Sequence, residues 1–263
     1  MSATATAGLQ TLAFGELEAG LWGCVWADGA GGTAALGSLD ASSEASTGAV
    51  AVSGSAAADD WALTGPDWGS GDGQLSLTVA AASPPASSSA LPGFEQLCRV
   101  RGRAAFGGVE HEINCLGVRT ARPGLDLSRL DSVREVSAWF EGEQALALTA
   151  LRPRGAAGHE RDAVSAAVFD PERVSDVEDP RLSTTYGRDG LPLRAGLELW
   201  LASEVGEDGK DGEEQQFPRR AAGEALGAGT SLSRPGLEVL ARPLRWHSRG
   251  LEGAGLYLLA RAG

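Results

Sequence analysis

Residues 98–106 read CRVRGRAAF, and their pattern indicates the fold class of the chain. Small or apolar residues recur at every second position from Cys98 to Phe106, and three arginines occupy positions between them. Successive side chains of a strand point to opposite faces, so this period of two predicts a half-buried antiparallel strand.

A second strand follows at once. Gly107-Gly108 predicts a tight turn, and apolar residues again alternate with polar ones over residues 109–118. The two strands therefore form a hairpin, in which Arg103 and Glu110 face each other across the pair.

Strand-like patterns continue along the rest of the chain. Turn residues separate them at intervals of roughly ten residues, which is typical of barrels and sandwiches and not of βαβ units. The Ala-rich segment 219–228 is the one place where we expect a short helix. The further predicted strands are residues 21–26, 49–53, 74–80, 133–141, 144–152, 163–169, 193–202, 242–248 and 255–261.

The composition limits both function and compartment. The net charge of −13 makes nucleic acid an unexpected partner, because phosphate backbones repel an acidic chain. Lys210 is the only lysine, so cofactor-lysine chemistry is excluded elsewhere. No apolar run is long enough to span a membrane, and no export signal is recognised at the start, so we expect a cytoplasmic protein. Cys24, Cys98 and Cys115 lack metal-binding spacing and are expected to be buried free thiols.

Two segments are expected to be loops. Residues 80–93 are rich in Pro, Ser and Ala, and residues 203–218 are dominated by Glu, Asp, Gly and Gln. Charge also divides the chain, since residues 1–98 contain ten acidic residues and no Lys or Arg.

The sequence contains no intact catalytic, metal-binding or cofactor-binding motif. Residues 29–34 (GAGGTA) match a dinucleotide-binding pattern, but a poor helix follows and a hairpin loop is favoured. His111 and Cys115 would lie about 13 Å apart on a strand, too far to share a metal. A Ser-His-Asp arrangement stays open, although nothing local supports it. The sequence therefore predicts no catalytic residue, no metal site and no cofactor.

The positions of the tryptophans allow two interpretations. In residues 133–141, Trp139 shares a mixed face with polar residues, and in residues 193–202 Trp200 does the same. Such faces either line the lumen of a ligand-binding barrel or cover an outer surface or an interface between domains.

Two stretches resemble the joint of the two-domain lipocalin-like (calycin) superfamily, which includes the carotenoid 1,2-hydratases (hydroxyneurosporene synthases). Residues 99–124 carry VRG at 100–102 and LGVR at 116–119, and residues 133–154 carry SAWFEG at 137–142 before a hairpin that ends in Leu-Arg. The resemblance implies an all-β fold of two lipocalin-like antiparallel β-barrels or half-barrels in tandem, at residues 1–125 and 126–263.

The same resemblance reveals a departure. In the family, acidic, histidine and tryptophan positions of the joint are expected to protonate an isoprenoid double bond or to orient water. This chain has TARPG at residues 120–124, so that proton donor is missing. Hydration of an alkene needs a carboxylic acid in a dry pocket whose aromatic faces stabilise the cation. The acids that remain are Glu112, Glu141, Glu178 and Asp179.

These observations favour a binding protein for an apolar, isoprenoid- or lipid-like small molecule, without catalysis. One alternative is a hydratase or cyclase that acts on an isoprenoid double bond through a relocated acid. The other is a structural or protein-interaction module with a filled barrel. The predicted ligand-binding residues are Trp139, Trp200, Trp246, Glu112 and Glu141.

Overall fold

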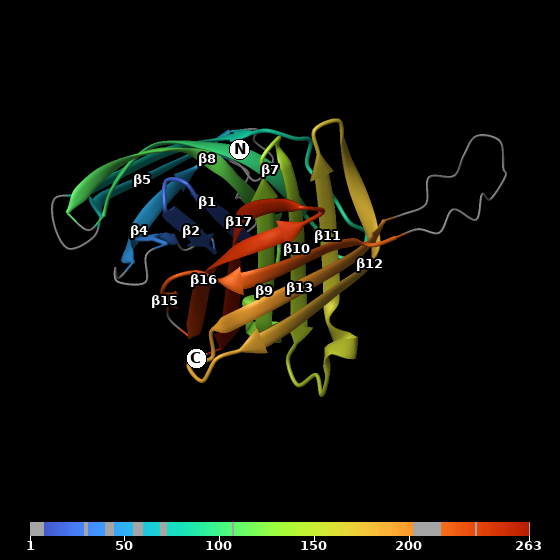
Figure 1. The fold of residues 1–263 in the computed structure, drawn as a ribbon. Coiled ribbons are helices and arrows are strands. Elements are labelled where there is room, and N and C mark those ends of the chain that lie inside the picture. Colours follow the sequence, from blue (N-terminus) through green and yellow to red (C-terminus); the bar gives the residue numbers. More distant parts are fainter. Residues whose placement is uncertain are drawn as a thin grey trace, which may run out of the picture.

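The computed structural model describes residues 8–28, 31–39, 45–54, 60–68, 73–106, 108–201, 217–234 and 236–262. These residues form two antiparallel β-barrels in tandem, as predicted (Figure 1). Helical structure within them is confined to two short 3-10 turns, η1 (Leu127–Arg129) and η2 (His159–Arg161).

The first barrel is closed by eight strands. Each strand pairs with the next, and the eighth pairs back onto the first, for example at Gln10 and Ala121. Its strands are β1 (Leu9–Glu16), β2 (Leu21–Ala27), β3 (Gly32–Ser38), β4 (Ser46–Ser53), β5 (Asp60–Trp68), β6 (Gly73–Ala81), β7 (Phe94–Phe106) and β8 (Val109–Arg122).

The second barrel closes through a different order. The sheet runs β14-β13-β12-β11-β10-β9-β17-β16, and pairing of β14 with β16 closes this ring of eight, while β15 adds to the side of β16. Its strands are β9 (Leu130–Phe140), β10 (Gln144–Pro153), β11 (Ala163–Asp170), β12 (Arg173–Tyr186), β13 (Pro192–Leu201), β14 (Arg219–Ala225), β15 (Thr230–Arg234), β16 (Leu237–Ser248) and β17 (Leu251–Ala262).

The β7–β8 hairpin confirms the period-two prediction. Val100 is fully buried while Arg101 is exposed, and Arg103 forms an ion pair with Glu110 at 3.8 Å. Gly102 is required by the backbone, because its φ is +145° and a Cβ would lie 2.0 Å from the carbonyl oxygen of Ser76. Glycine here lets the long strand bend into the barrel wall.

The prediction of a short helix over residues 219–228 is wrong. Arg219–Ala225 is strand β14, in which buried and exposed side chains alternate. It pairs with both β13 and β16, and a Cβ on Gly223 would lie 2.8 Å from the Trp246 ring. Tertiary pairing therefore overrides the helix propensity of the alanines.

Six strands were not predicted: β1, β3, β5, β12, β14 and β15. The loop expected after β6 is present, with one isolated bridge between Ala86 and Glu95. Of the motif at 29–34, residues 29–30 lie outside the described part of the chain, and the rest leads into β3, which pairs with β2 as a hairpin. Most of the acidic loop predicted at 203–218 also lies outside it, because residues 202–216 are not described.

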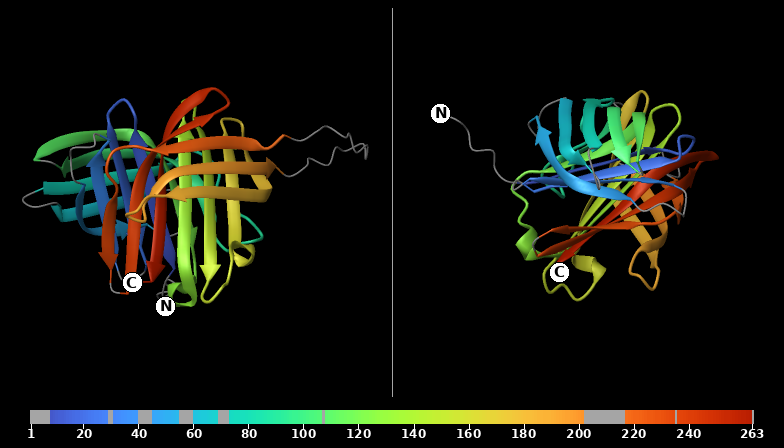
Figure 2. Two further views of the ribbon diagram at one scale, coloured as in Figure 1. Left: turned by 60° about the horizontal axis from the view of Figure 1, so that its bottom comes forward. Right: turned by 90° about the vertical axis from the view of Figure 1, so that its left-hand side faces the viewer.

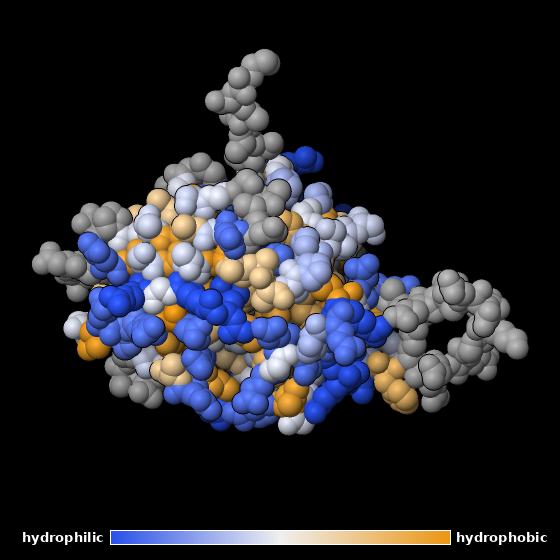
Figure 3. Space-filling view, turned by 90° about the horizontal axis from the view of Figure 1, so that it is seen from above, coloured by the Kyte–Doolittle hydropathy of each residue, from blue (hydrophilic) through white to orange (hydrophobic). Residues whose placement is uncertain are grey.

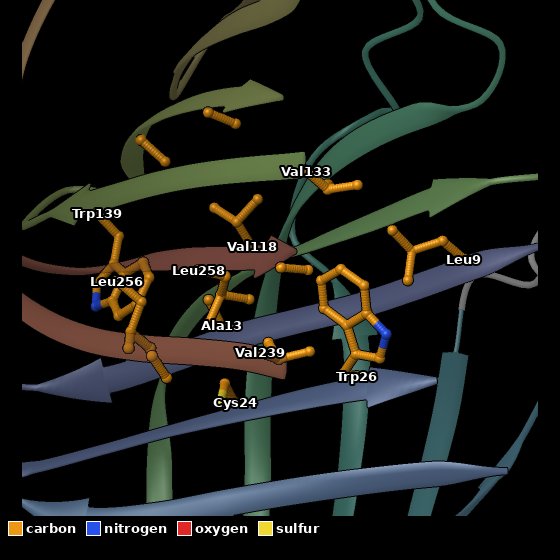
Figure 4. Close-up of a cluster of buried hydrophobic side chains, with 14 of the residues drawn as sticks. Leu9, Ala13, Cys24, Trp26, Val118, Val133, Trp139, Val239, Leu256 and Leu258 are labelled. Atoms are coloured by element: carbon orange, nitrogen blue, oxygen red, sulfur yellow. The ribbon is translucent and has the colours of Figure 1, made fainter. Parts of the chain in front are cut away.

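Three buried clusters hold the fold together. One fills the first barrel around Phe14, Trp61 and Val100, and another fills the second barrel around Trp246 and Tyr257. The third lies between the barrels, which stand side by side in Figure 2. Figure 4 shows its residues from both barrels, among them Leu9, Ala13, Trp26, Val118, Val133, Trp139, Leu256 and Leu258.

All three cysteines are buried and unbridged, as predicted. Burial raises the pKa of each thiol to about 12. Thiols of this kind are structural and not nucleophilic.

The surface is mixed. Figure 3 shows hydrophilic and hydrophobic residues interspersed over the face seen from above. In the described ranges, no helix is long and apolar enough to cross a membrane.

Candidate functional site

A groove of about 390 Å³ opens between the two barrels at one end of their contact. Both barrels build it, so it exists only where the two pack together. This volume falls within the range of small-molecule sites. We call it the inter-barrel groove, and it is lined by Gly15, Glu16, Leu17, Glu18, Arg99, Asn114, Cys115, Leu116, Trp139, Phe140, Glu141, Glu252, Gly253 and Ala254.

Trp139 forms part of the apolar wall of this groove. Alternation along β9 turns Val133, Ser137 and Trp139 toward the first barrel, while Phe140 points into the second. The Trp139 indole N–H donates to the carbonyl oxygen of Gly15 at 2.8 Å, which fixes the ring across the barrel contact. This bond orients Trp139, which borders the groove with 4% of its surface exposed.

The groove has an acidic rim. Glu16, Glu18, Glu141 and Glu252 line it, against one arginine, Arg99. Arg99 is already bound to Glu143 at 2.6 Å. The rim therefore disfavours an anionic ligand and leaves a neutral one acceptable.

The structure places two of the five predicted ligand-binding residues together, since Trp139 and Glu141 both line the groove. The other three lie elsewhere. Trp246 is fully buried inside the second barrel, and Glu112 is exposed on β8. Trp200 shares the outward-facing side of β13 with Glu198, to which its indole N–H donates at 3.1 Å. Whether any of the five binds a ligand stays a prediction.

Neither mixed face lines a barrel lumen. That of β9 packs against the first barrel, and that of β13 faces outward, which is the second of the two interpretations given by the sequence.

A second polar group of residues lies deeper between the barrels. Glu95 is 1% exposed and accepts hydrogen bonds from Arg122, from Ser165 at 2.6 Å and from Thr149 at 3.1 Å. Arg122 also donates to Ser165 at 2.7 Å. We call Glu95, Arg122, Thr149 and Ser165, together with Thr11 and Glu135, the polar seam.

Glu135 is the most unusual member of the seam. Its Oε2 accepts a 2.5 Å hydrogen bond from Thr11, whereas its buried Oε1 has no partner among the described residues. The pKa of Glu135 is raised to about 7, chiefly because the group is buried. The Thr11 hydrogen bond and Arg122 oppose this shift, and the nearby Glu95 adds to it. This carboxyl group can therefore hold a proton near neutral pH.

The space beside Glu135 is very small. A cavity of about 10 Å³ lies there, bordered also by Thr11, Thr120 and Ser137. Such a cavity has room for about one water molecule. Glu135 also lies four residues from Trp139 on β9, about 13 Å along the strand. A ligand in the inter-barrel groove therefore does not reach this acid.

Sequence reasoning missed the polar seam. The family resemblance implies an acid within residues 120–124. This segment instead contributes Arg122, which donates a hydrogen bond to Glu95. The sequence does place Glu135 beside Ser137 and Trp139 on the mixed face of residues 133–141. The structure shows that this whole face is buried. Within the described residues, no group of three His, Cys, Asp or Glu side chains is placed to hold a metal ion.

Comparison with known proteins identifies the fold. A scan against protein-family models gives no match, and a search of curated proteins gives none. Solved structures do match over nearly the full chain. CghA with Sch210972 aligns with a TM-score of 0.62 at 13% identity, covering 98% of this chain and 89% of CghA. The chain has a tandem lipocalin-like fold.

Two further structures support that conclusion. A protein from Nitrosomonas europaea assigned as AttH aligns with a TM-score of 0.62 at 10% identity, covering 98% of this chain and 93% of its own. Kievitone hydratase from Nectria haematococca aligns with a TM-score of 0.60 at 8% identity, and the alignment covers 99% of this chain and 90% of the hydratase chain. At these identities the likeness extends to the fold alone.

Proposed function

We propose that this lipocalin-like chain binds a small, largely apolar molecule in the inter-barrel groove and does not chemically change it. The observation that carries the proposal is the 390 Å³ groove with the fixed Trp139 in its wall. Aromatic and aliphatic walls with a few polar groups at the edge are the usual composition of such sites.

The absence of turnover rests on the position of the acids. The carboxylates that line the groove belong to its rim, and three of them, Glu18, Glu141 and Glu252, are exposed. The buried acid suited to protonation, Glu135, lies against a cavity of one-water size and away from the groove. An acid that protonates a double bond must contact it, and this arrangement separates the two.

Native mass spectrometry of freshly expressed protein tests the proposal. We expect a co-purified apolar molecule on the wild type and none on Leu116→Glu, which places a charge in the groove wall. Leu116→Met keeps the wall apolar and should retain the molecule. Equal loading of the two variants would place the ligand elsewhere.

A second candidate is acid-catalysed hydration or cyclisation of an isoprenoid double bond. The raised pKa of Glu135 favours it, and one of the similar structures is named a hydratase. The test is turnover of a carotenoid-like alkene. Turnover that is lost in Glu135→Gln and kept in Glu112→Gln would support this candidate and contradict the binding function.

A further inference from the structure

A second hollow, of about 560 Å³, lies on the second barrel and is distinct from the inter-barrel groove. Strands β12, β13 and β14 and the β16–β17 turn surround it. It shares no lining residue with the groove.

Small residues contribute to this hollow. Ser183, Gly196 and Ala222 come from three adjacent strands. Gly196 has no positive φ, and a Cβ there would meet only the hydroxyl of Ser183, at 2.6 Å. Neither backbone strain nor a backbone contact therefore requires glycine at this position, and its effect is to leave the space open.

The charge of the hollow is opposite to that of the chain. Arg181, Arg220 and Arg249 line it, with Glu198 as the lining carboxylate. The imidazole of His247 also lines it and lies 4.0 Å from Glu252. The protein as a whole has a net charge of −13. An excess of guanidinium groups in one hollow of an acidic protein creates a local attraction for anions.

Glu198 holds two of the arginines in place. It forms ion pairs with Arg220 at 3.2 Å and Arg181 at 3.6 Å, and it accepts the Trp200 indole N–H at 3.1 Å. Arg181 is further bound by Asp179 at 2.6 Å. One glutamate shared between two arginines orients both and leaves donors of Arg220 unused.

Arg249 supplies a guanidinium from the turn. Its φ is +49° and that of Gly250 is +78°, a two-residue hairpin turn in which asparagine is the preferred first residue. Within the described part of the chain, Arg249 forms no ion pair. Burial lowers the pKa of the neighbouring Arg219, and the charge of Arg249 adds to this shift. An arginine here adds positive charge that no described carboxylate balances.

We propose that this hollow binds a small polyvalent oxyanion, a phosphorylated or polycarboxylic molecule, through Arg220, Arg249 and Ser183. The forked guanidinium matches the geometry of phosphate and carboxylate oxygens. The arginines are largely exposed, so the affinity depends on salt.

Isothermal titration calorimetry of the full chain with pyrophosphate and with citrate, at low ionic strength, tests this site. We expect saturable binding of one or both probes. Arg249→Asn and Arg220→Gln should each weaken it at least about fivefold, the effect of losing one exposed ionic contact. Arg101→Gln, at an exposed position of the first barrel, should leave it unchanged.

Arg249→Asn is the informative variant, because asparagine suits the turn and the protein should fold at least as well as the wild type. Its melting temperature is measured alongside. Absence of saturable binding of both probes to the wild type overturns the proposal, and so do equal affinities of the wild type and both variants. Binding of pyrophosphate alone or of citrate alone assigns the oxyanion class.

Discussion

The hydroxyl of Thr11, on the first strand of the first barrel, donates a 2.5 Å hydrogen bond to the carboxyl group of Glu135, on the first strand of the second. Both residues are buried. This bond ties the barrels together, as do the hydrogen bonds that the Glu95–Arg122 pair of the first barrel makes to Thr149 and Ser165 of the second. None of these polar groups can reach bulk water. The polar seam therefore fixes how the two halves of the groove meet, because β9 carries both Glu135 and Trp139.

The first prediction concerns pH. Burial raises the pKa of Glu135 from 4.5 to about 7, so the folded protein keeps a proton that the unfolded chain loses above pH 4.5. The contribution of this group to the free energy of unfolding is therefore full below pH 4.5, falls as the pH rises toward 7, and is lost above it. The loss is about 3 kcal/mol.

Urea unfolding at pH 5 and pH 8 measures this effect. Glu135→Gln keeps an acceptor for Thr11 but does not ionise, so its free energy of unfolding should change less between the two pH values than that of the wild type. Glu112→Gln, at an exposed position, should behave as the wild type. The same pH dependence in Glu135→Gln and wild type would exclude Glu135 as the titrating group.

The second prediction concerns the buried ion pair. Glu95→Leu leaves Arg122 charged and unpaired between the barrels, and should cost about 3 to 5 kcal/mol of stability. The double variant Glu95→Leu/Arg122→Met removes both charges and should recover much of that loss. Denaturant midpoints of the single and double variants decide the matter, and additive losses would show that the two side chains do not interact.

The third prediction tests the two faces of β7. Val100 is fully buried in the first barrel and Arg101 is exposed. Val100→Asp buries an unpaired carboxylate and should cost several kcal/mol, whereas Arg101→Gln should cost under about 1 kcal/mol. Equal chemical-denaturation midpoints would contradict the assigned faces.

Sequence patterns predicted the β7–β8 hairpin because arginines on one face and apolar residues on the other leave a single interpretation. They failed for β12, in which no side chain is buried and which contains Pro180. They failed for β14 because the identity of its partner strands is not local information. The division into two domains at residue 125 stays a prediction, although the first sheet ends at Arg122 and the second begins at Leu130.

The sequence predicted only part of the candidate site. Trp139 and Glu141 were selected because a mixed face with a tryptophan suggests a ligand wall, and both line the groove. Glu135 was not selected, although it shares the mixed face with Trp139, because a mixed face alone does not show that it is buried. Only the packing of one barrel on the other buries it.

The fourth prediction concerns the thiols. Since burial raises the pKa of all three cysteines to about 12, the native protein should react very slowly with a thiol reagent at pH 8. Denatured, unreduced protein should report three free thiols. A count of one after denaturation would instead indicate a disulfide.

Titration of the protein with a neutral apolar fluorescent dye tests whether the inter-barrel groove binds a ligand. We predict that the wild type binds the dye and that Trp139→Ala weakens binding by about 1 to 3 kcal/mol through lost aromatic contact, provided its circular dichroism shows that it is folded. Trp200→Ala, outside the groove, should bind as the wild type does. Absence of binding to the wild type, or equal affinity in folded Trp139→Ala, would contradict a ligand site between the barrels.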